Sequence, residues 1–345
     1  MLGRNIMTQE PLDKEKLLDE YILDIIHRNN AMKEYQDFLK KEYNKKPLEE
    51  IKSLLKTNME EERAYLGLKD GDRKPHNDFE LLQREIPRNI VSQYYRDTEE
   101  VKQIRGSATN QMNSIKENPS LSPEEKDKKI SLIRELAGQK LDVEYQKHLP
   151  EIEARGYEKQ TYIAILARRE ADVHNRQVVQ EEFNTNKKDD DLILFDEDRD
   201  AGNCTKSLTV SLYKLQEKYD ILVFDELKDI EDIAHPKELS KKLSKYIRTA
   251  ETGNLEDLNL KKGDIILLTR QSTGKPGHAM MCHGFDENNE PLLLGFSSID
   301  KGIKANKDRS GDARKGIIID VQSLIEDAIK SKEHQNIMTS ITKQR

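Results

Sequence analysis

The sequence predicts an α+β protein, with an all-helical N-terminal region followed by a compact domain that contains a helix and a small antiparallel sheet. Of its 345 residues, 36% are charged and 35% are hydrophobic, which suits long amphipathic helices accompanied by one modest core. After residues 184–191, the apolar pattern changes from a helical period to short strand-like runs. A chain of this length also exceeds what one hydrophobic core usually organises, so two domains are expected.

Residues 1–183 consist mostly of helix-forming residues. The clearest helix begins after Ser122, because Pro123 and Glu125 complete a capping box in its first turn. Its apolar residues recur at helical spacing: Ile130, Ile133, Leu136, Ala137 and Leu141. Similar patterns occur over residues 17–38, 48–65, 79–101 and 162–183. We therefore expect a helical bundle or an elongated hairpin whose charged faces are solvated.

The second domain is expected over residues 192–345, after a linker at residues 184–191 that is polar and has no apolar period. Strands are predicted at residues 192–195, 265–268, 279–285, 291–296 and 316–320. Helices are predicted at residues 205–219, 236–252 and 321–330. One helix followed by several strands, with further helices added, is typical of an α+β domain.

Cys204 is the first candidate for chemistry in this domain. It follows two turn residues, Gly202 and Asn203, and it directly precedes the helix predicted from Thr205. Free N–H groups and the positive end of the helix dipole stabilise a thiolate at such a position and make it a usable nucleophile. The same amides can bind an oxyanion on a substrate carbonyl. The alternative is an inert buried thiol, which is what most free cysteines are.

A β-hairpin around His278 supplies a candidate base. The strand that begins at His278 ends at a turn over residues 286–290, and a second strand then runs back from Pro291. A four-residue loop places Ser297 directly opposite His278, whereas a three-residue loop places Ser298 there. Either serine could accept a hydrogen bond from the imidazole and orient it. Asp300 is the nearest carboxylate that could do so instead.

A metal site is not predicted. Side chains alternate along a strand, so His278 and Cys282 share one face while His283 points the other way. Three ligands do not converge easily from opposite faces, and Cys204 is the only other cysteine in the sequence. We expect no metal or other cofactor, and we interpret Cys282 as a small buried hydrophobic residue. So few cysteines also indicate folding in a reducing compartment.

Taken together, these segments resemble the papain-like superfamily of cysteine hydrolases. The likeness is greatest to its small bacterial members, the NlpC-like and CHAP amidases and peptidases and the peptidase domains of bacteriocin exporters. It covers roughly residues 192–325, and the matching residues are Asn203-Cys204, Gly263-Asp264, Gly277-His278 and Gly284-Phe285-Asp286. The resemblance implies a papain-like domain in which Cys204 is the nucleophile and His278 is the general base.

Two positions depart from the pattern of that superfamily. Ser297 or Ser298 stands where an Asn, Asp, Gln or His usually orients the base. Asp198 stands where papain-like enzymes often carry an oxyanion-hole glutamine, and an ionised carboxylate cannot donate a hydrogen bond. Asn203 or backbone amides would have to stabilise the oxyanion instead.

The function implied by this resemblance is thiol-dependent hydrolysis of a protein substrate by a protease, an isopeptidase or deubiquitinase, or an amidase. The helices of residues 1–183 would then recognise a partner. This architecture is similar to that of effector proteins that bacteria inject into host cells. The alternative is a helical binding or scaffold protein with a catalytically inactive papain-like domain, to which high charge and extended helices are equally suited.

Charge and hydropathy exclude other classes. The net charge is −7 with both signs mixed, so no basic face for nucleic acid is indicated. No uncharged apolar run reaches the ~20 residues that a membrane span needs, and the first residues lack the apolar segment of a signal peptide. We expect a cytoplasmic protein, or one exported by a route that needs no cleaved signal.

Overall fold

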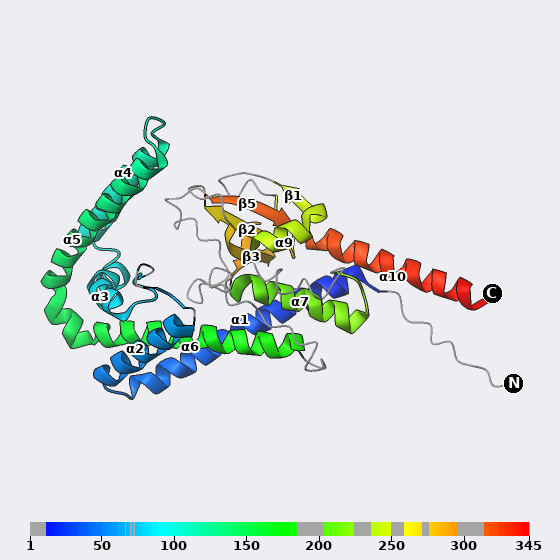
Figure 1. Cartoon of the computed structure of the whole chain (residues 1–345), viewed down its shortest axis with the longest axis horizontal. Helices are drawn as coiled ribbons and strands as arrows, with labels where there is room; N and C mark the ends of the chain where they lie inside the picture. Colours follow the sequence, from blue (N-terminus) through cyan, green and yellow to red (C-terminus); the bar gives the residue numbers. More distant parts are fainter. Residues whose placement is uncertain are drawn as a thin grey trace. The chain divides into compact units, whose positions relative to one another are not determined.

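The computed structural model contains two compact units, which we call unit 1 (residues 1–32 and 174–345) and unit 2 (residues 33–173) (Figure 1). The residues that the structure describes are 12–65, 67–69, 71, 73–184, 203–223, 236–249, 259–270, 276–295 and 314–344. Over these residues the chain is mostly helical and has one five-stranded antiparallel sheet. The predicted α+β class is therefore confirmed.

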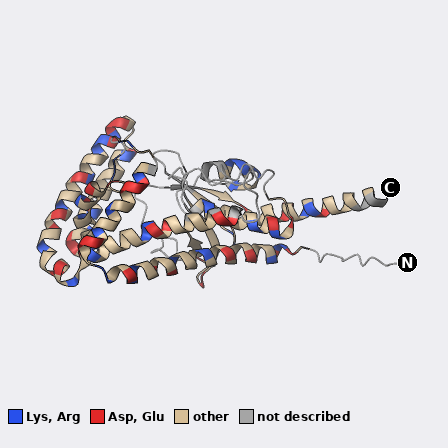
Figure 2. Cartoon of the chain, turned by 60° about the horizontal axis from the view of Figure 1, so that its bottom comes forward, with Lys and Arg blue, Asp and Glu red and all other residues tan. Residues whose placement is uncertain are grey.

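Unit 2 is entirely helical in its described part. Its elements are residues 33–44 of α1 (Lys14–Asn44), α2 (Leu48–Tyr65), α3 (Phe79–Tyr94), α4 (Glu99–Glu117), α5 (Pro123–Arg155) and residues 157–173 of α6 (Tyr157–Asn184). Side chains from all of these helices form one apolar core, which includes Leu39, Leu55, Ile90, Val101, Ile152 and Leu166. Residues of both charge signs are interspersed along the helices (Figure 2), as expected for solvated helix faces.

The capping box predicted at Ser122 is present at the start of α5. The Ser122 hydroxyl accepts a hydrogen bond from the backbone N–H of Glu125, and the Glu125 carboxylate accepts one from the Ser122 N–H at 2.8 Å. At the other end, Gly156 has a left-handed backbone with φ of 65° and separates α5 from α6. Glycine adopts this conformation without steric cost.

One helical segment differs from the prediction. The pattern over residues 79–101 is divided, because α3 ends at Tyr94 and α4 begins at Glu99. The carbonyl of Tyr95 accepts hydrogen bonds from both the N–H and the hydroxyl of Thr98. Such local bonds from a threonine compete with helix continuation and favour a turn.

Unit 1 combines the sheet with helices from both ends of the chain. Its sheet has the strand order β1-β5-β2-β3-β4. The strands are β1 (Ile247–Thr249), β2 (Ile265–Arg270), β3 (Pro276–Phe285), β4 (Pro291–Leu294) and β5 (Arg314–Ile319). The described helices that lie wholly in unit 1 are α7 (Asn203–Tyr219), α9 (Pro236–Lys242), the 3-10 turn η4 (Ser244–Tyr246) and α10 (Val321–Gln344). Residues 14–32 of α1 and 174–184 of α6 also belong to this unit.

Apolar residues cover both faces of this sheet. One face belongs to a large cluster that joins α1, α6, α7, α9 and α10 to the strands: Leu17, Tyr21, Ile25, Val179, Leu208, Leu212, Leu239, Ile265, Met281 and Leu324 are among its members. The other face carries a small cluster made of Leu260, Ile266, Cys282, Leu293 and Ile318. Residues before position 33 thus contribute to the same core as the C-terminal strands, while residues 185–191 of the expected linker lie outside the described residues.

The helix predicted over residues 236–252 is shorter in the structure, which corrects that prediction. It ends at Lys242, and Ile247 instead pairs with Ile319 in the edge strand β1. The carbonyl of Tyr246 also accepts a hydrogen bond from the N–H of Asp320. Pairing with a distant strand therefore decides the structure of a segment whose local pattern is helical. The strand predicted at residues 192–195 lies outside the described part of the chain.

None of the helices in the described ranges combines the length and the apolar character that crossing a membrane would require.

Candidate active site

Cys204 lies in the first turn of α7, since that helix begins at Asn203. The helix has 17 residues and lies against β3, the strand that carries His278 (Figure 1). Two elements that bear the sequence-predicted nucleophile and base are therefore neighbours within unit 1. The side chains of Asn203, Cys204 and His278 are outside the described part of the structure, as are residues Asp198, Ser297, Ser298 and Asp300.

The helix α7 is buried on nearly all sides. Its described residues from Thr205 to Tyr213 are each no more than 6% exposed. Two of its buried hydroxyls bond back to the helix or to a neighbour: Thr209 donates to the carbonyl of Thr205 at 2.9 Å, and Ser211 donates to the carboxylate of Asp24 at 2.6 Å. The buried Ser207 hydroxyl has no hydrogen-bond partner among the described residues. Close packing and these two hydrogen bonds hold this helix in one position. The helix that begins beside Cys204 is therefore anchored in the core of unit 1.

The backbone of β3 is irregular next to His278. His278 pairs with Leu268 of β2, but Thr269 then pairs with Pro276, so Gly277 is an extra residue in β3. A β-bulge of this kind bends the strand and changes the direction of nearby side chains. Bulges are over-represented next to active sites. The bulge at Gly277 thus lies directly beside the predicted base.

The β3–β4 hairpin is observed, with a turn over residues 286–290 that the Asp286 carboxylate stabilises by accepting hydrogen bonds from two backbone N–H groups. The paired residues are Phe285–Pro291, Gly284–Leu292, Cys282–Leu293 and Met281–Leu294. Because His283 is an extra residue in β3, the pairs beyond it have the register of a hairpin with a four-residue loop. This is the register that would put Ser297, rather than Ser298, opposite His278. The two serines themselves remain a prediction.

The Gly263-Asp264 motif has a structural role. Gly263 has φ of 91°, which favours glycine, and a Cβ at this position would lie 2.4 Å from Cδ1 of Leu18. Its N–H donates to the carbonyl of Cys282 at 2.7 Å, and the Cys282 N–H donates to the carbonyl of Asp264 at 2.9 Å. These contacts position the start of β2 against β3 and α1, which explains a glycine at this point without any catalytic role.

Asp264 is the centre of a buried ionic cluster in unit 1. Its side chain is fully buried, accepts a hydrogen bond from the N–H of Lys261 at 2.6 Å and forms an ion pair with Arg248 of β1. Asp320, at the start of α10, pairs with Lys261 at 2.8 Å and with Arg248 at 3.6 Å. Burial raises the pKa of Asp264 to about 6, although the Lys261 N–H and the Arg248 guanidinium oppose this effect.

Sequence reasoning did not identify this cluster. Asp320 has a local signal, because an aspartate before a helix commonly caps it, and its carboxylate does accept from the N–H of Ser323 at 3.0 Å. Arg248 has none, since the segment around it was predicted to be helical. The cluster connects β1, β2 and α10, and we interpret it as part of the structural framework.

Cys282 and His283 belong to the group of His278, Cys282 and His283 in which no metal site is predicted. Cys282 is fully buried, and burial raises the pKa of its thiol to about 11, so it is a poor nucleophile at neutral pH. His283 is partly buried, and burial together with the nearby Lys262 charge lowers its pKa. Within the described ranges, no three or more histidine, cysteine or acidic side chains are grouped so that they could bind a metal ion.

A scan of the sequence against protein-family models finds no match, and searches of curated proteins and of solved structures find none either.

Proposed function

We propose that unit 1 is a papain-like hydrolase domain that cleaves an amide or isopeptide bond in a protein substrate. One observation carries the proposal: Cys204 lies in the first turn of a buried helix, and that helix packs on the strand that contains His278. A thiol at a helix start favours the thiolate, and a base on an adjacent element is the arrangement that activates such a nucleophile.

In the proposed reaction the Cys204 thiolate attacks the carbonyl carbon, and the amide N–H groups at the start of α7 stabilise the resulting oxyanion. The His278 imidazole, which holds the proton taken from the thiol, delivers it to the leaving amine as the C–N bond breaks. Water, deprotonated by the same imidazole, then hydrolyses the thioester and restores the thiol. Asn203 is a further candidate donor to the oxyanion, and Ser297, Ser298 or Asp300 would orient the imidazole.

The proposal places a specific demand on β3. The imidazole of His278 must lie on the side of the sheet that α7 covers. Ala279 and Met281 are members of the cluster on that side, whereas Met280 and Cys282 pack on the opposite side. Strict alternation groups position 278 with Met280. His278 itself still pairs in regular register with Leu268, and the bulge lies beside it at Gly277. The proposal therefore requires the backbone at this bulge to turn position 278 toward α7, as β-bulges can do.

The reactivity of the two cysteines tests the proposal directly. Alkylation by iodoacetamide near neutral pH should label Cys204 rapidly and leave Cys282 unlabelled in the folded protein, because only the former is expected to carry a thiolate. His278→Ala should slow the labelling of Cys204 at pH 6 by about tenfold or more, since the imidazolium no longer stabilises the thiolate. Cys282→Ala is the matched control and should label like the wild type.

Activity is tested on the same variants with an activity probe made of ubiquitin carrying a thiol-reactive C-terminus and with a peptide acylating probe. Cys204→Ala and His278→Ala should each abolish labelling and turnover, because nucleophile and base act as one unit. Equal labelling of both cysteines, or unchanged Cys204 reactivity in His278→Ala, would contradict the catalytic pair. The protein would then be better described as a helical scaffold with an inactive domain.

A further inference from the structure

Helix α5 has an apolar stripe that its neighbours do not cover. Leu132, Leu136 and Val143 are 59%, 48% and 57% exposed. They are spaced by four and seven residues, which places them on one face of the helix. Together they form an exposed apolar surface on one face of the helix, and exposed apolar patches often serve as contact surfaces. We refer to these three residues as the α5 stripe.

The other two faces of α5 are already occupied. One packs on α3, where Gly138 lies against the Arg88 guanidinium and Asp142 binds it at 2.9 Å. α5 also packs on α4. A second face of α5 carries apolar residues that are buried or partly buried: Ile130, Ile133, Ala137 and Leu141. The α5 stripe lies on the third face of the helix. The stripe is therefore separate from the two faces of α5 that pack inside unit 2.

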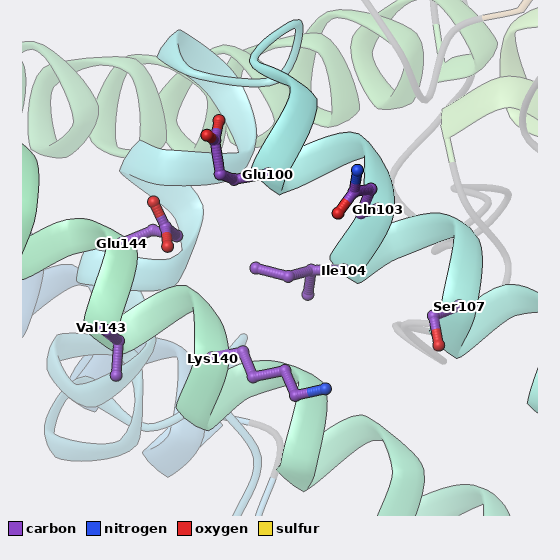
Figure 3. Close-up of a pocket in the computed structure, with 7 residues that line it drawn as sticks. All are labelled: Glu100, Gln103, Ile104, Ser107, Lys140, Val143 and Glu144. Atoms are coloured by element: carbon purple, nitrogen blue, oxygen red, sulfur yellow. The ribbon is translucent and has the colours of Figure 1, made fainter.

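A groove between α4 and α5 continues from one end of this stripe. The groove has a volume of about 460 Å³, and Val143 belongs both to the stripe and to the groove lining. Figure 3 shows Ile104 extending from α4 into the space between the two helices, with Lys140 and Glu100 at its edges. Ile104 and Val143 are the apolar residues of the groove, and its other lining residues are polar or charged: Glu100, Gln103, Ser107, Lys140 and Glu144.

The border has an identifiable charge pattern. The carboxylates nearest the stripe already have partners, because Glu135 pairs with Arg88 at 3.4 Å and Glu144 pairs with Lys147 at 2.5 Å. Lys128, Lys129 and Lys140 are exposed and form no ion pair with any residue in the described ranges. Arg88 is shared by Glu85, Glu135 and Asp142, so Glu135 keeps part of its negative charge, and Lys129 lies near the Glu125 carboxylate. The three exposed lysines still outnumber the carboxylates beside the stripe, which leaves an excess of positive charge there. At the groove end, Glu100 provides a negative charge that is also without an ion-pair partner among the described residues.

We propose that the α5 stripe and the adjoining groove bind an amphipathic helix of another protein, with apolar residues at helical spacing and acidic residues beside them. A helix of about three turns spans the stripe, because each residue rises about 1.5 Å, and helices commonly dock on apolar grooves in this way. Acidic residues would pair with Lys129 and Lys140, and a basic residue would suit Glu100. This extends the expected role of the helical region and does not depend on the hydrolase proposal.

Two other occupants fit the charge pattern less well. In a symmetric dimer the same face of each copy would meet, which would bring Lys128, Lys129 and Lys140 of one copy toward those of the other. An anionic membrane would attract these lysines but would repel Glu100 in the groove, and the stripe has none of the aromatic residues that favour membrane interfaces. A helix with acidic residues near the lysines and a basic residue near Glu100 complements the charges both along the stripe and in the groove.

The test is a selection of random 16-residue peptides displayed on phage against the full-length protein, with counter-selection on the Leu136→Ser variant. The recovered peptides should share apolar residues at helical spacing with Asp or Glu beside them. A synthetic version of the consensus peptide should bind the wild type in fluorescence anisotropy. Leu136→Ser should weaken this binding at least about tenfold, as expected for the loss of a central apolar contact.

Charge reversal gives a second, independent measurement. Lys140→Glu should weaken binding of the acidic peptide and should strengthen binding of a version in which the acidic residues are replaced by lysine. Leu54→Ser, at an exposed leucine of α2 in the same unit, is the control and should leave both affinities unchanged. Circular dichroism of each variant verifies that the fold is retained.

Several outcomes would overturn the proposal. If the peptides bind Leu136→Ser as tightly as the wild type, the α5 stripe is not the binding surface. If the peptides contain no excess of acidic residues, the lysines beside the stripe do not select the partner. Dimerisation in sedimentation velocity that Leu136→Ser abolishes would assign the surface to a second copy of the chain. Binding to phosphatidylglycerol vesicles that the same variant abolishes, with no peptide recovered, would assign it to a membrane.

Discussion

Helices α7 and α5 both contain many polar residues but have opposite environments. In α7 the described side chains from Thr205 to Tyr213 are all buried, although many of them carry hydroxyl groups. In α5, which has 33 residues, only Ile130, Gly138, Glu144 and Ile152 are buried. The number of elements packed around each helix makes this difference. α7 has the sheet on one side and parts of α1 and α6 on the other, whereas α5 has α3 and α4 as neighbours.

The comparison teaches that polar content does not by itself predict exposure. Serine and threonine are small, and inside a helix their hydroxyl groups can bond the backbone carbonyl one turn earlier, as Thr209 bonds Thr205 in α7. Such side chains therefore tolerate complete burial. Most of the long charged side chains of α5 stay exposed and keep most of that helix in water. Glu144, which pairs with Lys147, is an exception. Unit 1 therefore depends on helices from distant parts of the chain to cover its core, whereas unit 2 builds its core from consecutive helices.

The sharpest test of this comparison divides the chain into fragments. A fragment of residues 185–345 should fail to fold, since it lacks the five buried α1 residues of its core: Leu17, Leu18, Tyr21, Ile22 and Ile25. Each buried side chain contributes about 1.5–3 kcal/mol, so together they provide on the order of 10 kcal/mol, comparable with the whole stability of a domain. A fragment of residues 33–173 retains all the side chains of its own core and should be helical by circular dichroism. A cooperative melting transition in fragment 185–345 would show that α1 is dispensable for unit 1.

A matched pair of leucine substitutions measures the same contrast at single positions. Leu208→Ala in α7 should lower the free energy of unfolding by about 2–5 kcal/mol, because it leaves a cavity at a fully buried site. Leu136→Ala in α5 should change it by no more than about 0.5 kcal/mol, because that side chain is half exposed. Urea denaturation followed by circular dichroism gives both values. Equal losses would mean that the α5 stripe is covered in the folded protein.

The smallest expected effect concerns pH and distinguishes unit 1 through its buried carboxyl group. The pKa of Asp264 is about 6 in the folded protein and near 3.8 when unfolded, so the folded state binds the proton more tightly. Its contribution to stability is then largest below about pH 4 and is lost as the pH rises to 6, by about 2–3 kcal/mol. Asp264→Asn should remove this loss. Urea midpoints of both proteins at pH 4.5 and pH 7 give the difference, and parallel pH profiles would contradict a raised pKa.

Several parts of the fold could be predicted because their signals are local. The capping box at Ser122 and the turn after Phe285 both depend on residues within a few positions of one another. The start of α7 beside Cys204 belongs to the same group, since turn residues and an apolar period occur together there. Local hydrogen bonds and backbone preferences decide such features before any tertiary contact forms.

The positions of the two candidate residues on a helix and a strand follow from local pattern, but how their side chains lie relative to each other does not. The sequence identified Cys204 at a helix start and His278 on a hairpin strand. β3 contains two extra residues that were not predicted. Gly277 interrupts its pairing with β2, and His283 interrupts its pairing with β4. Bulges depend on how a strand fits its two neighbours, and those neighbours come from distant parts of the chain. The relation between the two candidate side chains is accordingly a tertiary property.

By itself, then, the sequence determined the α+β class, most helices and strands, and the location of its reactive residue types. Only the tertiary structure decided that α1 belongs to the core of unit 1, that the segment around Arg248 is a strand, and that Asp264 is buried beside it. It also decided which face of α5 has no neighbour. The physical reason is range: turns, caps and helical periods are encoded within a few residues, whereas burial and strand pairing depend on segments that are far apart along the chain.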